Sequence, residues 1–137
     1  MNFFLSLHQF ADVALLILRL SVGCIFLFHG LPKRGLWSAQ PSAQMPAAMI
    51  TKLRILSIVE PAGALGLIFG FLTQAAAIGL VIVMSGAIQF LVSKVHRKFK
   101  EEHTAGWEFE FLLLVSALVL AILGGGKYAL DRAVFGI

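Results

Sequence analysis

Four apolar stretches of the chain are each long enough to form a membrane-spanning helix, which takes about 20 mostly apolar residues. They run approximately over residues 10–31, 54–72, 74–93 and 107–123. Each stretch is continuously apolar, whereas the strands of a membrane barrel alternate between apolar and polar positions. The pattern predicts an all-α fold, with one domain over residues 1–137 that forms a four-helix transmembrane bundle.

The connections between these stretches differ in length and character. Residues 71–74 leave almost no loop between the second and third stretches, which predicts a tight antiparallel helical hairpin. Residues 32–53 form a longer, proline-containing connection, and residues 94–106 form a charged one. Three glycines at 124–126 are expected to end the fourth helix.

Basic residues in the connections predict the orientation of the bundle. Eight of them lie in or beside the first and third connections: Lys33, Arg34, Lys52, Arg54, Lys94, Arg97, Lys98 and Lys100. The opposite side holds Lys127 and Arg132. Cytoplasmic loops carry an excess of Lys and Arg. We therefore expect a multi-pass membrane protein, with the first and third connections in the cytoplasm and both termini outside.

Composition agrees with a membrane protein and excludes two other classes. Apolar residues make up 59% of the 137 residues, and charged residues make up only 13%. A soluble domain of this length could not bury the apolar surface of so many apolar side chains. The net charge of +4 does not indicate nucleic-acid binding, because the basic residues lie between apolar runs. A single cysteine, Cys24, cannot form an intrachain disulfide.

Ionisable residues inside the apolar stretches are the candidates for chemistry. A charge at the centre of a membrane costs roughly 2.5–3.5 kcal/mol, so it normally faces the bundle interior and has a partner. Arg19, Gly23, Phe26, Gly30 and Lys33 recur at steps of four and three, and therefore share one helix face. We expect the glycines on this face to let another helix approach closely.

The depths of these residues suggest a single polar column. At 1.5 Å per residue, Arg19 lies roughly 18 Å, Glu60 roughly 9 Å and Glu110 roughly 5 Å from the cytoplasmic ends of their helices. An extended arginine could bridge much of the distance to Glu60, with Glu110 and His29 completing the column. Glu108 points to nearly the opposite face from Glu110, and we choose Glu110 for the column because it lies deeper in the apolar run. An Arg19–Glu60 pair could be either a functional site or a buried ion pair that fixes helix register.

No metal or haem site is expected. Ligation would require two histidines on facing helices at matched depth, whereas His96 and His103 fall in the charged third connection. Gly66 and Gly70 form a close-packing motif that could join helices within one chain or drive a homo-oligomer.

Three groups of residues resemble motifs of the DoxX family over nearly the whole chain. They are Leu18-Arg19-Leu20 with Gly23, Phe26 and His29-Gly30-Leu31-Pro32-Lys33; Glu60 with Gly63, Gly66 and Gly70; and Gly106-Trp107-Glu108-Phe109-Glu110 with Gly124-x-Gly126-x-Tyr128-x-Leu130-Asp131. One departure is Ala129, where the family often has serine.

The resemblance implies a small four-helix inner-membrane protein linked to redox chemistry. Some members of the family serve as a membrane subunit of thiosulfate:quinone oxidoreductase. By this resemblance Glu60, Glu110 and Arg19 would be catalytic, and His29, Lys33, Tyr128 and Asp131 would bind the quinone. A soluble or membrane partner protein would supply the electrons, because the chain shows no cofactor-binding motif of its own.

Three functions remain open from the sequence. The first is a quinone-linked redox subunit, with or without turnover of its own. The second is a non-catalytic membrane anchor or assembly factor for a partner enzyme. The third, a small-molecule transporter, ranks last because four helices leave little room for a pathway and the chain has no inverted repeat.

Overall fold

The computed structural model describes residues 6–42, 45–101 and 106–136, and the side chain of Arg34 and residue His103 lie outside that description. The described residues form helices and connections only, so the all-α expectation is confirmed. The elements in chain order are η1 (Leu7–Phe10), α2 (Ala11–Gly30), η2 (Leu31–Ser38), α3 (Ala47–Phe69), α4 (Thr73–Ser93), α5 (Glu108–Leu123) and α6 (Leu130–Phe135).

Two elements depart from the sequence-based boundaries. α3 begins at Ala47 rather than near Arg54, directly after Pro46, whose extended backbone ends the preceding connection. The residues that follow α2 continue as the 3-10 helix η2 instead of an irregular loop. The short helix α6 was not predicted, because a six-residue segment carries too little periodic pattern to detect.

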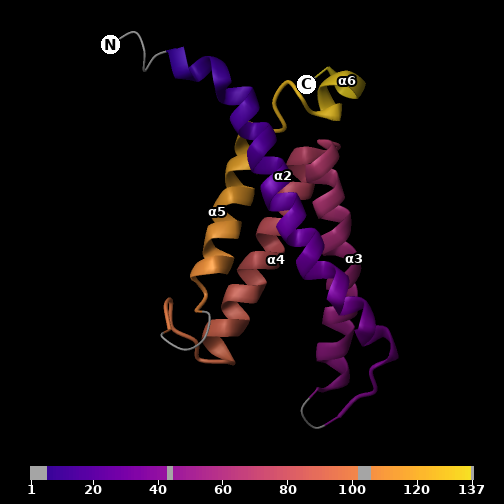
Figure 1. Cartoon of the computed structure of the whole chain (residues 1–137). Coiled ribbons are helices and arrows are strands. Elements are labelled where there is room, and N and C mark those ends of the chain that lie inside the picture. The colour runs from indigo at the N-terminus through magenta and orange to yellow at the C-terminus, as the bar shows by residue number, and fades with distance from the viewer. Residues whose placement is uncertain (1–5, 43–44, 102–105, 137) are drawn as a thin grey trace.

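The four long helices form two pairs that diverge toward one end of the molecule. α2 packs mainly against α3, and α4 packs mainly against α5. Figure 1 shows α3 and α4 meeting at the upper end, close to α6, and separating toward the lower end, where η2 and the α4–α5 connection lie. The upper end is therefore closed by the α3–α4 turn, and the lower end is open between the two pairs.

The glycine-containing face of α2 packs directly on α3, as predicted. Arg19, Gly23, Phe26 and Gly30 are all buried. A Cβ atom on Gly23 would lie 2.9 Å from the backbone oxygen of Ala64, and one on Gly30 would lie 2.7 Å from Cδ of Pro61. These contacts fix the depth of α2 relative to α3, because neither glycine can be replaced without separating the two helices.

The surface of the bundle is rich in large apolar side chains. Exposed examples occur on every long helix, including Ile17, Ile58, Ile82 and Ile122. The segment Leu7–Ser38 and helix α4 are long and apolar enough to cross a membrane. α3 and α5 do not meet the same criterion, because α3 carries three charged residues, Lys52, Arg54 and Glu60, and α5 has only 16 residues.

Replacing Gly23 with alanine should destabilise the α2–α3 contact. The added methyl group would lie 2.7 Å from Cγ1 of Ile68 and 2.9 Å from a backbone oxygen, so the helices must move apart. We expect a loss of about 1–3 kcal/mol in the free energy of unfolding, measured by thermal unfolding in detergent.

Gly79→Ala on α4 is the matched control. A Cβ at Gly79 meets no atom within 4 Å, so this variant should be neutral or more stable by about 0.5–1 kcal/mol through helix propensity. Equal stability of the two variants would show that α2 and α3 are not in close contact at Gly23.

Candidate functional site

An ion pair between a half-buried lysine and a buried glutamate joins η2 to the middle of α3. Nζ of Lys33 lies 2.5 Å from both carboxylate oxygens of Glu60. The Glu60 side chain is 2% exposed and that of Lys33 is 27% exposed. The contact of Gly30 with Glu60 and Pro61 brings the end of α2 to this level of α3, and Lys33 follows three residues later.

η2 is held against α3 by a second set of contacts, which keeps Lys33 in place. The guanidinium of Arg54 donates hydrogen bonds to the carbonyl oxygens of Leu36, Trp37 and Ala39, at 3.2, 3.0 and 3.1 Å. The indole Nε1 of Trp37 donates to the hydroxyl of Ser57 at 3.0 Å. In the sequence, Arg54 indicates only the topology, because its acceptors are backbone atoms that no side-chain pattern reveals.

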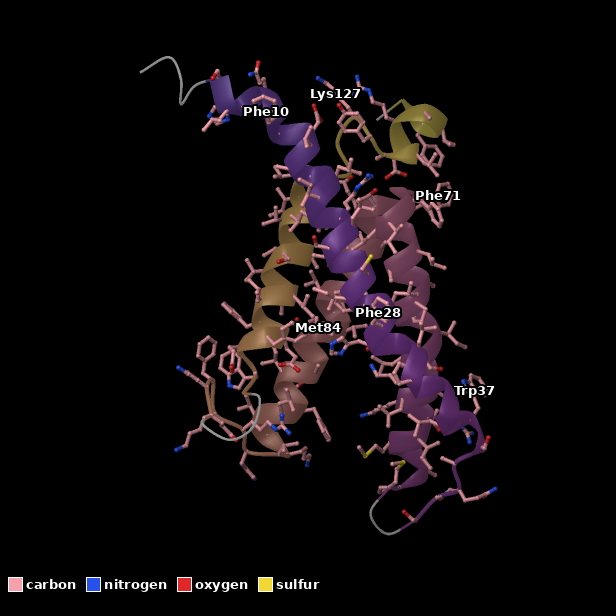
Figure 2. The ribbon with its side chains drawn as sticks, in the orientation of Figure 1. Phe10, Phe28, Trp37, Phe71, Met84 and Lys127 are labelled. Atoms are coloured by element: carbon pink, nitrogen blue, oxygen red, sulfur yellow. The ribbon has the colours of Figure 1, made fainter. Side chains whose placement is uncertain are left out.

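The Lys33–Glu60 pair lines a cavity of about 940 Å³ at the lower end of the bundle. All four long helices contribute to its wall, and Met84, labelled in Figure 2, lies on it near the middle of the bundle. Its polar lining includes His29, Lys33, Glu60 and Glu110, and most of the remaining lining is apolar. Four of the seven sequence-predicted site residues therefore meet at one cavity.

His29 and Glu110 come to the cavity from two helices that are in contact, α2 and α5. The imidazole of His29 on α2 stacks on the ring of Phe109 on α5, with a centroid separation of 5.5 Å. Glu110 lies in the first turn of α5, and its buried Oε2 has no hydrogen-bond partner among the described residues. Glu108 lies outside the cavity lining, which agrees with the choice of Glu110 over Glu108.

A second hollow of about 400 Å³ lies at the upper end of α3 and α4. All the side chains that line it are uncharged, and they include Ala62, Phe69 and Ala76. We place no chemistry there.

The expected Arg19–Glu60 pair is wrong. Arg19 is 1% exposed, but its Nη2 donates to the carbonyl oxygen of Tyr128 at 3.1 Å. Glu60 lies at the level of Gly30, eleven residues or roughly 16 Å along α2 from Arg19, which is beyond the reach of an arginine side chain. The axial estimate failed because it assumed that the two helix ends lie at the same depth, whereas Gly30, the last residue of α2, lies against Glu60, thirteen residues after the start of α3.

Arg19 instead belongs to a polar network at the upper end, formed with Gly70, Tyr128 and Asp131. The carboxylate of Asp131 accepts hydrogen bonds from the backbone N–H groups of Leu72 and Thr73, at 2.5 and 2.8 Å. Its own N–H donates to the carbonyl oxygen of Gly70 at 2.8 Å. Asp131 therefore caps the N-terminus of α4 from a distant part of the chain.

The ionisation of Asp131 depends on these contacts. Burial raises the pKa of its carboxyl group, but the hydrogen bonds of Thr73 and Leu72 and the Arg19 charge lower it more, so the pKa lies below its usual range. Tyr128 contributes its carbonyl oxygen to the network, while its side chain is exposed.

Comparison with known proteins identifies the family. The family model DoxX matches residues 14–94, which is more than half of the chain and includes α2, α3 and α4. The chain belongs to the DoxX family. A protein named "Putative oxidoreductase CatD", from Bacillus subtilis (strain 168), is 29% identical over 128 residues, which cover 90% of this chain and 89% of that protein. No solved structure matches the chain.

The polar residues of this DoxX-family chain thus divide between two ends of the bundle. His29, Lys33, Glu60 and Glu110 lie at the lower cavity, whereas Arg19, Tyr128 and Asp131 lie in the upper network. Sequence reasoning treated all seven as one site because a motif gives order along the chain and not depth in the bundle. In the sequence, the upper network was indicated only by the position of Asp131, which follows a few residues after the glycines that end α5.

Asp131→Asn should weaken the cap of α4 and leave the Arg19 charge without a nearby anion. We expect the free energy of unfolding to fall by about 1–2 kcal/mol at neutral pH. The pKa of the Asp131 carboxyl group is lower in the folded than in the unfolded chain. Its contribution to the free energy of unfolding is therefore complete above about pH 4, and it disappears as the pH falls through the pKa of the folded protein. Wild-type protein should therefore lose stability more steeply below pH 4 than the variant.

Thermal unfolding between neutral and acid pH measures this difference. Asp12→Asn is the control, because Asp12 forms a more exposed pair with Lys127 at 3.2 Å, where solvent screens the two charges. If the stability of wild type and of Asp131→Asn fell in parallel with pH, the assignment of ionised Asp131 as the cap of α4 would be wrong.

Proposed function

We propose that helices α2–α5 form a four-helix transmembrane bundle in the plasma membrane, with the lower end in the cytoplasm. The membrane association of the DoxX family, the apolar surface and the two span-length apolar helices support this. Lys52, Lys94, Lys98 and Lys100 lie toward the lower end, as expected for cytoplasmic segments. The first described residues and α6 share the upper end (Figure 1), as an even number of spans requires.

We propose that the lower cavity binds the headgroup of a quinone and that the protein is a membrane subunit of a quinone-linked oxidoreductase. The observation that carries this is the ion pair of the half-buried Lys33 with the buried Glu60 on the wall of a mostly apolar cavity. Its volume of about 940 Å³ lies within the range of about 300–1,000 Å³ typical of small-molecule sites. The name of the Bacillus subtilis relative supports a redox function.

The cavity residues fit the needs of such a ligand. A bound quinone accepts two electrons and two protons, so its carbonyl oxygens need hydrogen-bond donors and a nearby acid. The ammonium group of Lys33 is a donor, and Glu60 holds it against the cavity wall. Glu110 has a carboxylate oxygen without a hydrogen-bond partner among the described residues, so it is free to exchange a proton. His29 is positioned by its stacking on Phe109.

We assign Arg19, Tyr128 and Asp131 to stabilising the upper end rather than to the quinone. Their hydrogen bonds connect α2, the segment after α5, and the start of α4. Electrons would come from a soluble or membrane partner protein, since no cofactor-binding motif is visible in the chain.

Glu60→Gln should weaken quinone binding about tenfold, because Lys33 loses the anion that positions it. Binding is measured by the shift of the unfolding temperature with added quinone, and endogenous quinone is quantified in a solvent extract of the purified protein. Lys33 is partly exposed, so its charge can reach solvent in the variant and the fold should persist.

Glu110→Gln provides a second variant, which should bind quinone but lose quinone-dependent turnover with the electron donor. Asp12→Asn, at the opposite end of the bundle, should change neither property. Purified protein that contains no quinone and shows no thermal shift would overturn the proposal and favour a non-catalytic membrane anchor.

A further inference from the structure

Apolar side chains of α3 and α4 line a part of the lower cavity that we call the slot. α3 contributes Met49, Leu53 and Leu56 to it, and α4 contributes Met84 and Ala87. Toward the lower end, the same two helices also place Lys52, Gln89, Ser93 and Lys94 on the cavity lining. The two helices join at the upper turn and diverge below it (Figure 1). The ion pair of Lys33 and Glu60 lies on the same cavity, and the slot is thus continuous with the proposed headgroup position.

The slot reaches the outer surface of the bundle. Ile55 on α3 and Phe90 on α4 both line the cavity, yet they are 56% and 44% exposed. Gly86 also lines it, and a Cβ atom built there would meet no heavy atom within 4 Å. Ile58 and Ile82, which are also exposed, extend the apolar surface on the same two helices.

We propose that this slot between α3 and α4 is the lateral passage for the apolar tail of the quinone, which enters from the bilayer. The proposal rests on the quinone function above and adds the ligand class, an amphiphile with a long alkyl or isoprenoid tail. The headgroup lies at Lys33 and Glu60, and the tail lies between α3 and α4 past Gly86. An apolar slot matches such a tail, because transfer of methylene groups out of water is favourable.

The alternative, entry of a tail-less ligand from the cytoplasm, predicts no role for the slot. A single quinone ring does not fill a cavity of about 940 Å³, whereas a ring with several tail carbons occupies far more of it. The α3–α4 slot supplies the apolar part of that volume.

Gly86→Leu tests the passage directly. The leucine side chain would project into open space on the cavity wall, so the fold should be retained while the slot is blocked. Gly79→Leu is the matched control, because it lies seven residues earlier on α4, also meets no atom within 4 Å, and is not part of the cavity lining. The probes are a decyl-substituted benzoquinone and the same ring without the decyl chain, titrated into protein in lipid nanodiscs.

We expect Gly86→Leu to weaken binding of the decyl probe by about tenfold, the change that follows from losing roughly two buried methylene groups. Binding of the tail-less ring should change less than about twofold, and Gly79→Leu should bind both probes like the wild type. If Gly86→Leu and Gly79→Leu bind the decyl probe equally, the passage is refuted and the headgroup site remains. If wild-type protein binds neither probe, both proposals fail.

Discussion

Burial of charge in an apolar bundle is the constraint on which the rest of the structure depends. A buried ion that lacks a partner is expensive, so each buried charge fixes the position of another segment. Glu60 holds η2 at the end of α2 through Lys33, and Arg19 holds the segment after α5 through the carbonyl oxygen of Tyr128. Each end of the bundle is therefore organised around a different charge.

The two ends differ in how tightly they are packed, and this difference determines where a ligand can bind. At the upper end Asp131 joins the start of α4 to α6, and Gly70 lies against the Arg19 side chain with a left-handed backbone. At the lower end the two helix pairs diverge and leave the large cavity. The closed upper end lets the lower end stay open without loss of the bundle, as ligand sites on a rigid scaffold require.

The sequence predicted those features that depend on local periodicity. The helical face of Arg19, Gly23, Phe26 and Gly30 is buried as expected, because the spacing of residues within one helix determines which of them share a face. The same geometry implied that only one of Glu108 and Glu110 could face the interior, and the depth of Glu110 in the apolar run indicated which; Glu110 lines the cavity and Glu108 does not.

The relative depth of residues on different helices could not be predicted in the same way. It depends on how the helix ends are aligned, and α3 extends well beyond the end of α2, so Glu60 lies beside Gly30 instead of near Arg19. The cap of α4 by Asp131 joins residues more than fifty positions apart, and Arg54 binds backbone carbonyls of η2. Contacts of this kind follow from the tertiary fold and leave no periodic signal in the sequence.

We propose that the chemistry of this DoxX-family protein belongs to the lower cavity and not to the upper arginine. The decisive experiment is a structure of the protein in lipid nanodiscs, determined experimentally with a bound quinone. We expect ring density in the cavity between α2, α3 and α5, with a carbonyl oxygen within hydrogen-bonding distance of Lys33. Ring density beside Arg19 and Asp131, with the cavity filled only by lipid, would refute this placement.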